Sequence, residues 1–217
     1  PGLLIGLYAQ IKLSATYRRY LDVGSTSGVT GAEAAQAILA NAGLGKVAVH
    51  EVGGHLTDHY DPMKKALFLS SENYHGRSLS AIGVAAREAG HALQHQAAYA
   101  PLQLRMALVP VTSFASHAWT WLVVLAFIMP AFFYKAIGVA IAISLVLVLF
   151  QLVTLPVEYD ASRRAKEQLL RLGLVSNRDG VGVSKVLNAA ALTYVAAMVT
   201  ALMTLLHLIM IARGRDH

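Results

Sequence analysis

Two long uncharged apolar runs constrain the fold of this 217-residue chain more than any other feature. Residues 136–155 form a run of 20, and residues 189–212 form a run of 24 in which His207 is the only side chain that titrates near neutral pH. About 20 helical residues cross a bilayer core that is about 30 Å thick. We therefore predict that both runs are transmembrane helices.

A third run, residues 118–134, has 17 positions without charge. Trp119 and Trp121 near its start are typical of the membrane interface. Because this run lies close to the next one along the chain, we predict a transmembrane hairpin over residues 118–155 with its turn at residues 132–135.

Residues 1–11 are apolar but too short to span a bilayer, and we interpret them as the end of a truncated N-terminal transmembrane helix. The fold class is therefore mainly α, an integral membrane protein with three full transmembrane helices and this truncated one. The hairpin places residues 12–117 and 156–188 on one side of the membrane, and residues 189–212 form the C-terminal span.

Charge and composition agree with a membrane protein. Charged residues make up 14% of the chain, against about 25% in soluble domains, and hydrophobic residues make up 56%. The net charge of +6 comes from basic residues that flank the apolar runs rather than from one dense cluster. We therefore expect the lipid bilayer as a partner and no nucleic acid. The absence of cysteine excludes thiolate zinc sites and a catalytic thiol.

The basic residues also predict an orientation. Of the 18 Lys and Arg residues, 15 lie on the side that holds residues 12–117 and 156–188, and only Lys135, Arg213 and Arg215 lie on the other. Since cytoplasmic segments near spans are enriched in Lys and Arg, we predict that this larger side is cytoplasmic.

Local patterns predict the elements of the cytoplasmic part. Thr30 and Glu33 have the spacing of a capping box, which predicts a helix over residues 31–42 that ends at Gly43. Residues 47–52 and 66–70 are predicted strands, so we expect a small β-sheet of two or three short strands.

The second strand, residues 66–70, is either a plain core strand or an edge that pairs with an extended substrate. The polar stretch between the strands contains His55 and His59. We interpret it as a turn supported by Asp58, Asp61 and Pro62, with a functional role near a cleft as the alternative.

A helix predicted over about residues 78–98 contains the chemically informative segment. Zinc peptidases of the His-Glu-x-x-His type place two metal-binding histidines four residues apart, and the glutamate between them takes a proton from metal-bound water. Here Glu88 and His91 match the glutamate and the second histidine, but Arg87 stands where the first histidine would be. By itself, this pair is better explained as the polar stripe of a buried helix.

A further helix is predicted to begin at Pro156 and to include Glu158. Arg163 and Arg164 on it are interpreted as a solvated or headgroup-facing surface.

Six stretches, in order along almost the whole chain, resemble the neutral zinc metallopeptidases of bacterial membranes. They are LYAQIKLSATYRRY (7–20), SGVTGAEAAQAIL (27–39), GHLTDHYDP (54–62), RSLSAIGVAAREAGHALQHQ (77–96), YAPLQLR (99–105) and VEYDASRRA (157–165). The resemblance implies a zincin-like helical core in residues 12–117, zinc as the family's cofactor and a peptide substrate. It also implies a multi-pass protein of the bacterial inner membrane.

Residue by residue, the resemblance makes His91 a zinc ligand, Glu158 in the helix and loop of residues 156–188 the third ligand, and Glu88 the catalytic base. The departure at Arg87 removes one ligand, because a guanidinium has no lone pair to donate. We expect zinc to be absent or weakly bound, and we predict that Arg87 takes the metal's place and pairs with Glu158 or Glu88. A site shifted by one turn would use His91, His95 and a carboxylate instead, without a base between the histidines.

Three functions remain open at this point. The chain is a metallopeptidase descendant impaired by Arg87, or a non-catalytic accessory subunit that binds other subunits of a larger membrane complex. Alternatively, it is an active zinc endopeptidase if the residue at position 87 is an engineered or erroneous change.

Overall fold

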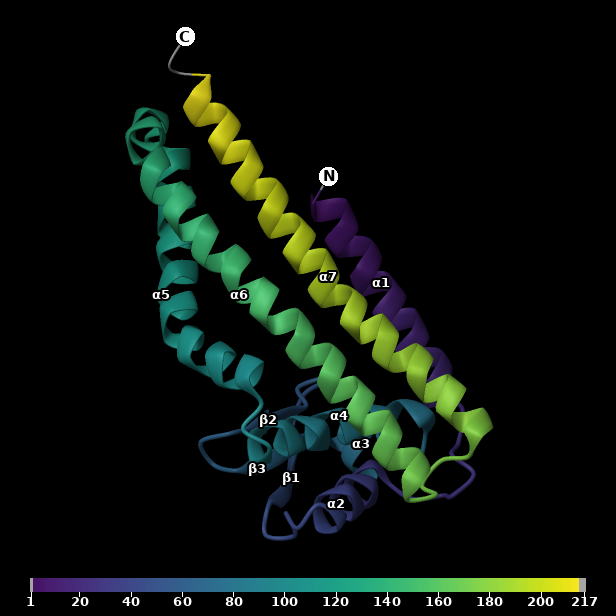
Figure 1. Ribbon diagram of the computed structural model, residues 1–217. Helices are drawn as coiled ribbons and strands as arrows, with labels where there is room; N and C mark the ends of the chain where they lie inside the picture. The colour runs from purple at the N-terminus through teal and green to yellow at the C-terminus, as the bar shows by residue number, and fades with distance from the viewer. Residues whose placement is uncertain (1, 215–217) are drawn as a thin grey trace. The chain divides into compact units, whose positions relative to one another are not determined.

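The protein is described by a computed structural model that gives the backbone of residues 2–214 and the side chains of that range except residues 130–135. Figure 1 shows a mainly helical chain with one small sheet. The described residues form two compact units. The first unit contains residues 2–8, 100–156 and 193–214, and the second contains residues 9–99 and 157–192. The elements in chain order are α1 (Gly2–Leu21), α2 (Gly31–Asn41), β1 (Ala48–Val52), β2 (His59–Asp61), β3 (Ala66–Ser70), α3 (Ser71–His75), α4 (Leu79–Gln96), α5 (Ala100–Ile128), α6 (Pro130–Arg171) and α7 (Asn177–Arg213).

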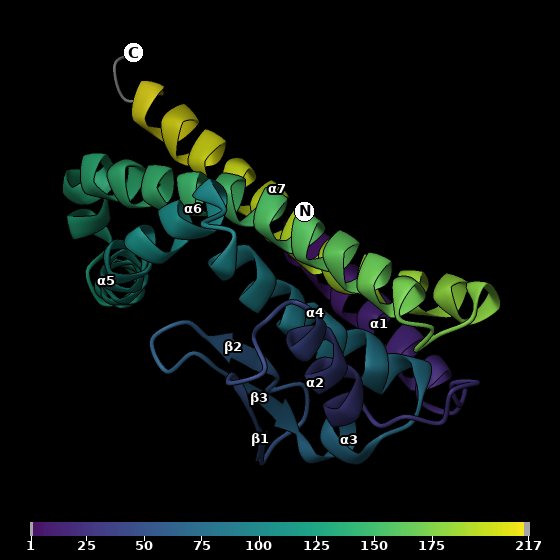
Figure 2. The same cartoon turned by 60° about the horizontal axis from the view of Figure 1, so that its bottom comes forward.

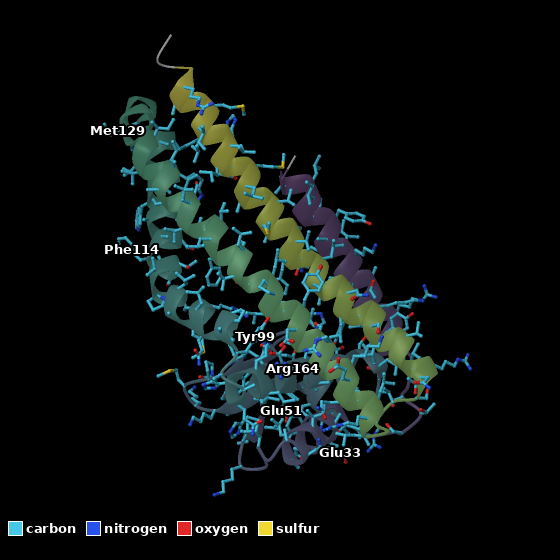
Figure 3. The ribbon with its side chains drawn as sticks, viewed as in Figure 1. Glu33, Glu51, Tyr99, Phe114, Met129 and Arg164 are labelled. Carbon is cyan, nitrogen blue, oxygen red and sulfur yellow. The ribbon has the colours of Figure 1, made fainter. Side chains whose placement is uncertain are left out.

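Three helices of the described residues are long and apolar enough to cross a membrane: α5, α6 from Ala136 onward, and α7. Large apolar side chains of α5 point away from the unit, with Phe114 77% and Phe127 90% exposed. Figure 3 shows Phe114 on the outer surface of α5, and Met129, which directly follows the helix, on the outside as well. Such exposure is costly in water and favourable in lipid. The predicted fold class, mainly α with a small sheet and three full spans, is confirmed.

The helix ends differ from those predicted at two places. The hairpin turn was predicted at residues 132–135, but α5 ends at Ile128 and α6 begins at Pro130. The cause is proline chemistry: the residue before a proline, here Met129, is driven out of the helical region, whereas proline fits the first helical position. The prediction of a separate helix from Pro156 is also wrong, since α6 continues through that proline, which removes only one backbone donor.

Helix α2 of the second unit begins at the capping box that the sequence predicted. The Thr30 hydroxyl accepts from the backbone N–H of Glu33 at 3.1 Å, and the Glu33 carboxylate accepts from the backbone N–H of Thr30 at 2.7 Å. This capping box satisfies two N–H groups that the first turn would otherwise leave without partners. Figure 2 shows α2 lying beside α4, against which it packs most extensively.

The sheet has the strand order β1-β3-β2, with β1 parallel and β2 antiparallel to β3. Both predicted strands are confirmed to within a residue, and the short strand β2 adds the third. Since β2 pairs along one side of β3 and β1 along the other, β3 is the central strand. The alternative that residues 66–70 form a substrate-binding edge is therefore wrong, and the interpretation as a core strand holds, with Leu67 and Leu69 fully buried.

Helix α4 lies in the centre of this unit's apolar core. Its N-terminus is capped by Ser78, whose hydroxyl accepts from the N–H of Ala81. Most of its side chains are buried, including the polar Glu88, His91 and Gln94. Charged side chains are seldom buried without partners, so a helix that buries them must find those partners on neighbouring elements or along its own face.

Gly90 sets the distance between α4 and α6. A Cβ atom at this position would lie 2.5 Å from the carbonyl oxygen of Ala161 on α6. Only glycine therefore lets the two backbones approach this closely. Because His91 follows Gly90 and Glu158 lies one turn before Ala161, the same contact brings the candidate site residues together.

We predict that Gly90→Ala lowers the free energy of unfolding by about 2 kcal/mol, since the new methyl group forces the two backbones apart. Gly83→Ala on the same helix is the matched control. A Cβ there would meet Val183 Cγ1 at an ordinary 3.4 Å. The higher helix propensity of alanine should therefore raise the free energy of unfolding by up to about 1 kcal/mol. Thermal unfolding of the purified protein in detergent measures both, and equal effects would contradict the argument.

Candidate functional site

Three acid–base side chains named from the sequence lie in one buried region of the second unit. Glu88 and His91 come from α4, and Glu158 comes from α6; they are 3%, 7% and 3% exposed. The Nε2 atom of His91 lies 3.6 Å from Oε2 of Glu158. The structure therefore brings together the residue types that the sequence resemblance assigned to one site.

Gln94 fixes the orientation of His91. Its amide nitrogen donates to the carbonyl oxygen of Val157 at 2.8 Å and to Oδ2 of Asp160 at 3.0 Å. Its carbonyl oxygen lies 3.0 Å from Nδ1 of His91 and can only accept, so Nδ1 carries the proton. The Nε2 atom is thereby directed at Glu158, the arrangement that an outer hydrogen bond gives a metal-binding histidine.

Electrostatics around His91 follow from burial and from two carboxylates. Burial alone lowers the pKa of His91, but the neighbouring Glu158 raises it, and Glu88 adds to that effect while Arg87 opposes it. The net result is a His91 pKa above its ordinary value. The two carboxylates therefore more than offset the effect of burial on the pKa of His91.

Arg87 pairs with Glu88, as one branch of the sequence hypothesis predicted. Its Nε and Nη2 atoms both donate to Oε1 of Glu88, at 3.0 and 2.9 Å. The Arg87 side chain is 16% exposed and that of Glu88 4%, so the pair is largely shielded from water. Charge-assisted bonds in such surroundings are strong, and Glu88 is held by a guanidinium rather than directed at open solvent.

The donor set does not fit a catalytic zinc centre, which takes three protein ligands and one open position. His91 and Glu158 offer two donors, Arg87 offers none, and Glu88 is engaged by the guanidinium. Among the residues whose side chains are described, no three His, Cys, Asp or Glu converge as a metal site requires. His95, the ligand of the shifted alternative, instead has Nδ1 2.8 Å from the hydroxyl of Tyr60.

The supporting residues were missed by the sequence interpretation. Asp160 accepts from Gln94 and also from Nε of Arg164 at 2.6 Å. The Arg164 side chain is 25% exposed, and its guanidinium lies 5.8 Å from the centre of the Tyr99 ring. Figure 3 labels both residues. The surface interpretation of Arg164 is therefore wrong, whereas Arg163 is 56% exposed. The available signal was spacing: Gln94 follows His91 by one turn, and Arg164 follows Asp160 by one turn.

The polar stretch before β3 acts as a structural turn. Oδ1 of Asp58 accepts from the N–H of Ser70 at 2.8 Å, and its Oδ2 accepts from the amide of Asn73 at 2.9 Å. Asp61 accepts from two backbone N–H groups of the turn between β2 and β3. The His55 ring lies 3.2 Å from a Glu72 oxygen. These contacts confirm the interpretation of a turn supported by Asp58 and Asp61.

Comparison with known proteins identifies the family of this chain. The family described as "Putative neutral zinc metallopeptidase" matches residues 1–213. The chain therefore belongs to this family, a class of membrane zinc metallopeptidases for which zinc is the expected cofactor.

A particular relative is the protein named "Putative membrane protease YugP" of Bacillus subtilis (strain 168), which is 46% identical over 213 residues. The match covers 98% of this chain and 94% of the relative. No solved structure matches the chain. With three membrane-spanning helices and a relative named as a membrane protease, the chain is a multi-pass membrane protein.

We predict that Arg87→Met destabilises the protein by about 3 kcal/mol, because it leaves the Glu88 carboxylate buried without this cation. The double variant Arg87→Met/Glu88→Gln should recover most of the loss, as removing both charges removes the penalty. The control Arg163→Met removes the ion pairs of a side chain that is 56% exposed, and Asp160 keeps its bonds to Gln94 and Arg164. It should lower the free energy of unfolding by less than about 1 kcal/mol. Additive effects of the two site substitutions, measured by thermal unfolding, would disprove the coupling.

We predict that Gln94→Leu lowers the free energy of unfolding by about 3 kcal/mol, because it leaves the Val157 carbonyl and the His91 Nδ1–H buried without this partner. Gln96→Leu is the control: Gln96 donates one exposed bond to the carbonyl of Ala42 and should cost less than about 1 kcal/mol. Thermal unfolding compares the two variants. Equal decreases in stability would show that burial of the Gln94 hydrogen bonds contributes nothing.

Proposed function

We propose that this chain is a membrane protein of zinc-metallopeptidase descent whose peptidase activity is impaired in this form because Arg87 replaces a zinc ligand. The observation that carries this proposal is the buried pair of Arg87 with Glu88. One substitution removes a metal ligand and at the same time engages the carboxylate that the family resemblance makes the catalytic base.

Two chemical properties of the Arg87–Glu88 pair support an impaired peptidase activity. A general base needs lone pairs that face the proton it accepts, and Oε1 of Glu88 instead receives two N–H groups of Arg87. A metal dication would also meet the positive guanidinium at close range, and the two like charges would repel. Restoring activity therefore requires removal of Arg87, not only supply of zinc.

The cellular placement is part of the proposal. The basic residues favour the cytoplasmic face of a bacterial inner membrane for residues 12–117 and 156–188, with spans over 118–155 and 189–212. A peptide substrate would reach the buried site from the cytoplasm if the enzyme were active.

Two alternatives each have one supporting observation. The accessory-subunit alternative is supported by a site that keeps its fold and hydrogen bonds while the donor set is incomplete; such a chain would bind other membrane subunits. The active-enzyme alternative, with position 87 as an engineered or erroneous change, is supported by His91, which Gln94 still orients as it would a ligand. A shifted site through His95 would have to break its bond to Tyr60.

The decisive experiment is Arg87→His, which restores the His-Glu-x-x-His pattern. We expect the purified variant to hold about one zinc per chain, to gain thermal stability on zinc addition, and to cleave an unfolded substrate such as labelled casein. The unmodified chain should hold far less zinc and cleave at least about 100-fold more slowly, since the loss of one ligand interaction is worth several kcal/mol.

Arg87→Ala is the matched control, because it removes the guanidinium without adding a ligand. It should show neither zinc-dependent stabilisation nor cleavage. The proposal fails if the unmodified chain retains about one zinc per chain through purification and chelation. It also fails if Arg87→His folds and binds zinc but cleaves no faster than the unmodified chain.

A further inference from the structure

A cationic cavity lies in the second unit, away from the site on α4. It has a volume of about 370 Å³ and is formed by one face of α1 and one face of α7. Its lining residues are Lys12, Thr16, Arg19, Tyr20, Lys185, Asn188, Ala189 and Leu192. Three of these residues are cationic, and among the described residues that line the cavity none is acidic.

The sequence places these side chains on matching helical stripes. Lys12, Thr16 and Arg19 follow the i, i+4, i+7 spacing of one face of α1. Lys185 and Asn188 follow the same type of spacing on α7, and Lys12, Arg19 and Lys185 are all exposed. Cations on two facing helices converge on one space, where a single anion can interact with all of them.

The packing of α1 on α7 makes this a formed cavity rather than a chance gap. Tyr20 lies so close to Gly182 that a Cβ atom at position 182 would be 2.9 Å from its ring. The same hypothetical Cβ would meet Leu79 of α4 at 2.6 Å. The guanidinium of Arg19 lies 5.9 Å from the ring of Tyr20, which places the cation above the cavity's aromatic wall. Glycine thus allows the close approach that positions the basic residues.

The position of the cavity along both helices indicates the source of the anion. On α7, the polar Lys185 and Asn188 are followed directly by Ala189 and the apolar run to residue 212. On α1, the apolar residues 3–11 come directly before Lys12. Both helices change from apolar to charged at the level of the cavity, as helices do at the boundary between acyl chains and headgroups.

We propose that this cavity binds the phosphate headgroup of an anionic phospholipid. Lys12, Arg19 and Lys185 interact with the phosphate, and the hydroxyl of Thr16 and the amide of Asn188 provide hydrogen bonds to the headgroup. Ala189 and Leu192 face the start of an acyl chain. A zwitterionic lipid matches less well, because its own cation would be repelled by three neighbouring cations. The site is independent of the metallopeptidase proposal, since it shares no residue with it.

The test uses the full chain purified in detergent and titrated with phosphatidylglycerol or phosphatidylcholine, with bound lipid counted by native mass spectrometry. We expect phosphatidylglycerol to bind more tightly than phosphatidylcholine. The triple variant Lys12→Gln/Arg19→Gln/Lys185→Gln should weaken phosphatidylglycerol binding by about 100-fold, about fivefold for each cation. Equal affinity for the two lipids in the unmodified chain would overturn the proposal.

A charge-matched control separates a site from general attraction. Arg18→Gln/Arg171→Gln/Arg178→Gln removes the same charge from exposed positions that do not line the cavity. It should change phosphatidylglycerol binding by less than about threefold, since surface charges further away are screened. A loss as large as that of the cavity variant would show nonspecific attraction and overturn the proposal.

Two further measurements cover the remaining outcomes. Asn188→Glu, at an exposed position, adds a carboxylate to the cavity and should abolish the preference for phosphatidylglycerol without lowering the melting temperature in neutral lipid. Inorganic phosphate is the second probe. If it displaces phosphatidylglycerol or stabilises the protein at the same concentration as the lipid, the cavity binds a free anion and the lipid assignment is wrong.

Discussion

Burial of charge between α4 and α6 is the constraint on which the candidate site depends. Gly90 allows the two backbones to approach, and that approach places Glu88, His91 and Glu158 in an interior from which water is largely excluded. Carboxylates in such a place need positive charge nearby, because an isolated buried ion costs far more than a fold can supply. The helix packing and the identity of residue 87 are therefore linked.

Formal charges show how the interior accommodates Arg87. A zinc dication with a neutral histidine would balance the charges of Glu88 and Glu158. In this structure the guanidinium of Arg87 places one positive charge on Glu88, and the carboxylates of Glu158 and Glu88 raise the pKa of His91, which favours a second positive charge there. Arginine suits the position better than lysine would, because its planar guanidinium can direct two N–H groups at one carboxylate oxygen.

Much of this structure could be predicted from the sequence because it depends on local or periodic signals. The capping box at Thr30, the spans, two strands and the helix that includes His91 all follow from spacing, hydropathy and turn residues. The Arg87–Glu88 pair was one of two predicted pairings, since the chemistry of a guanidinium beside buried acids leaves few options. The role of β3 was open, because no short-range pattern shows whether a strand has one neighbour or two.

The errors have physical causes that a single sequence does not reveal. Hydropathy locates an apolar stretch but not the ends of its helix, so α6 was divided at Pro156 although the helix continues through it. Arg164 was assigned to the surface because arginine is usually exposed. Its partner Asp160 and the orienting Gln94 form a chain of hydrogen bonds that connects α4 with α6. Such a chain exists only after packing, which is also why the outer support of a site is harder to predict than its ligands.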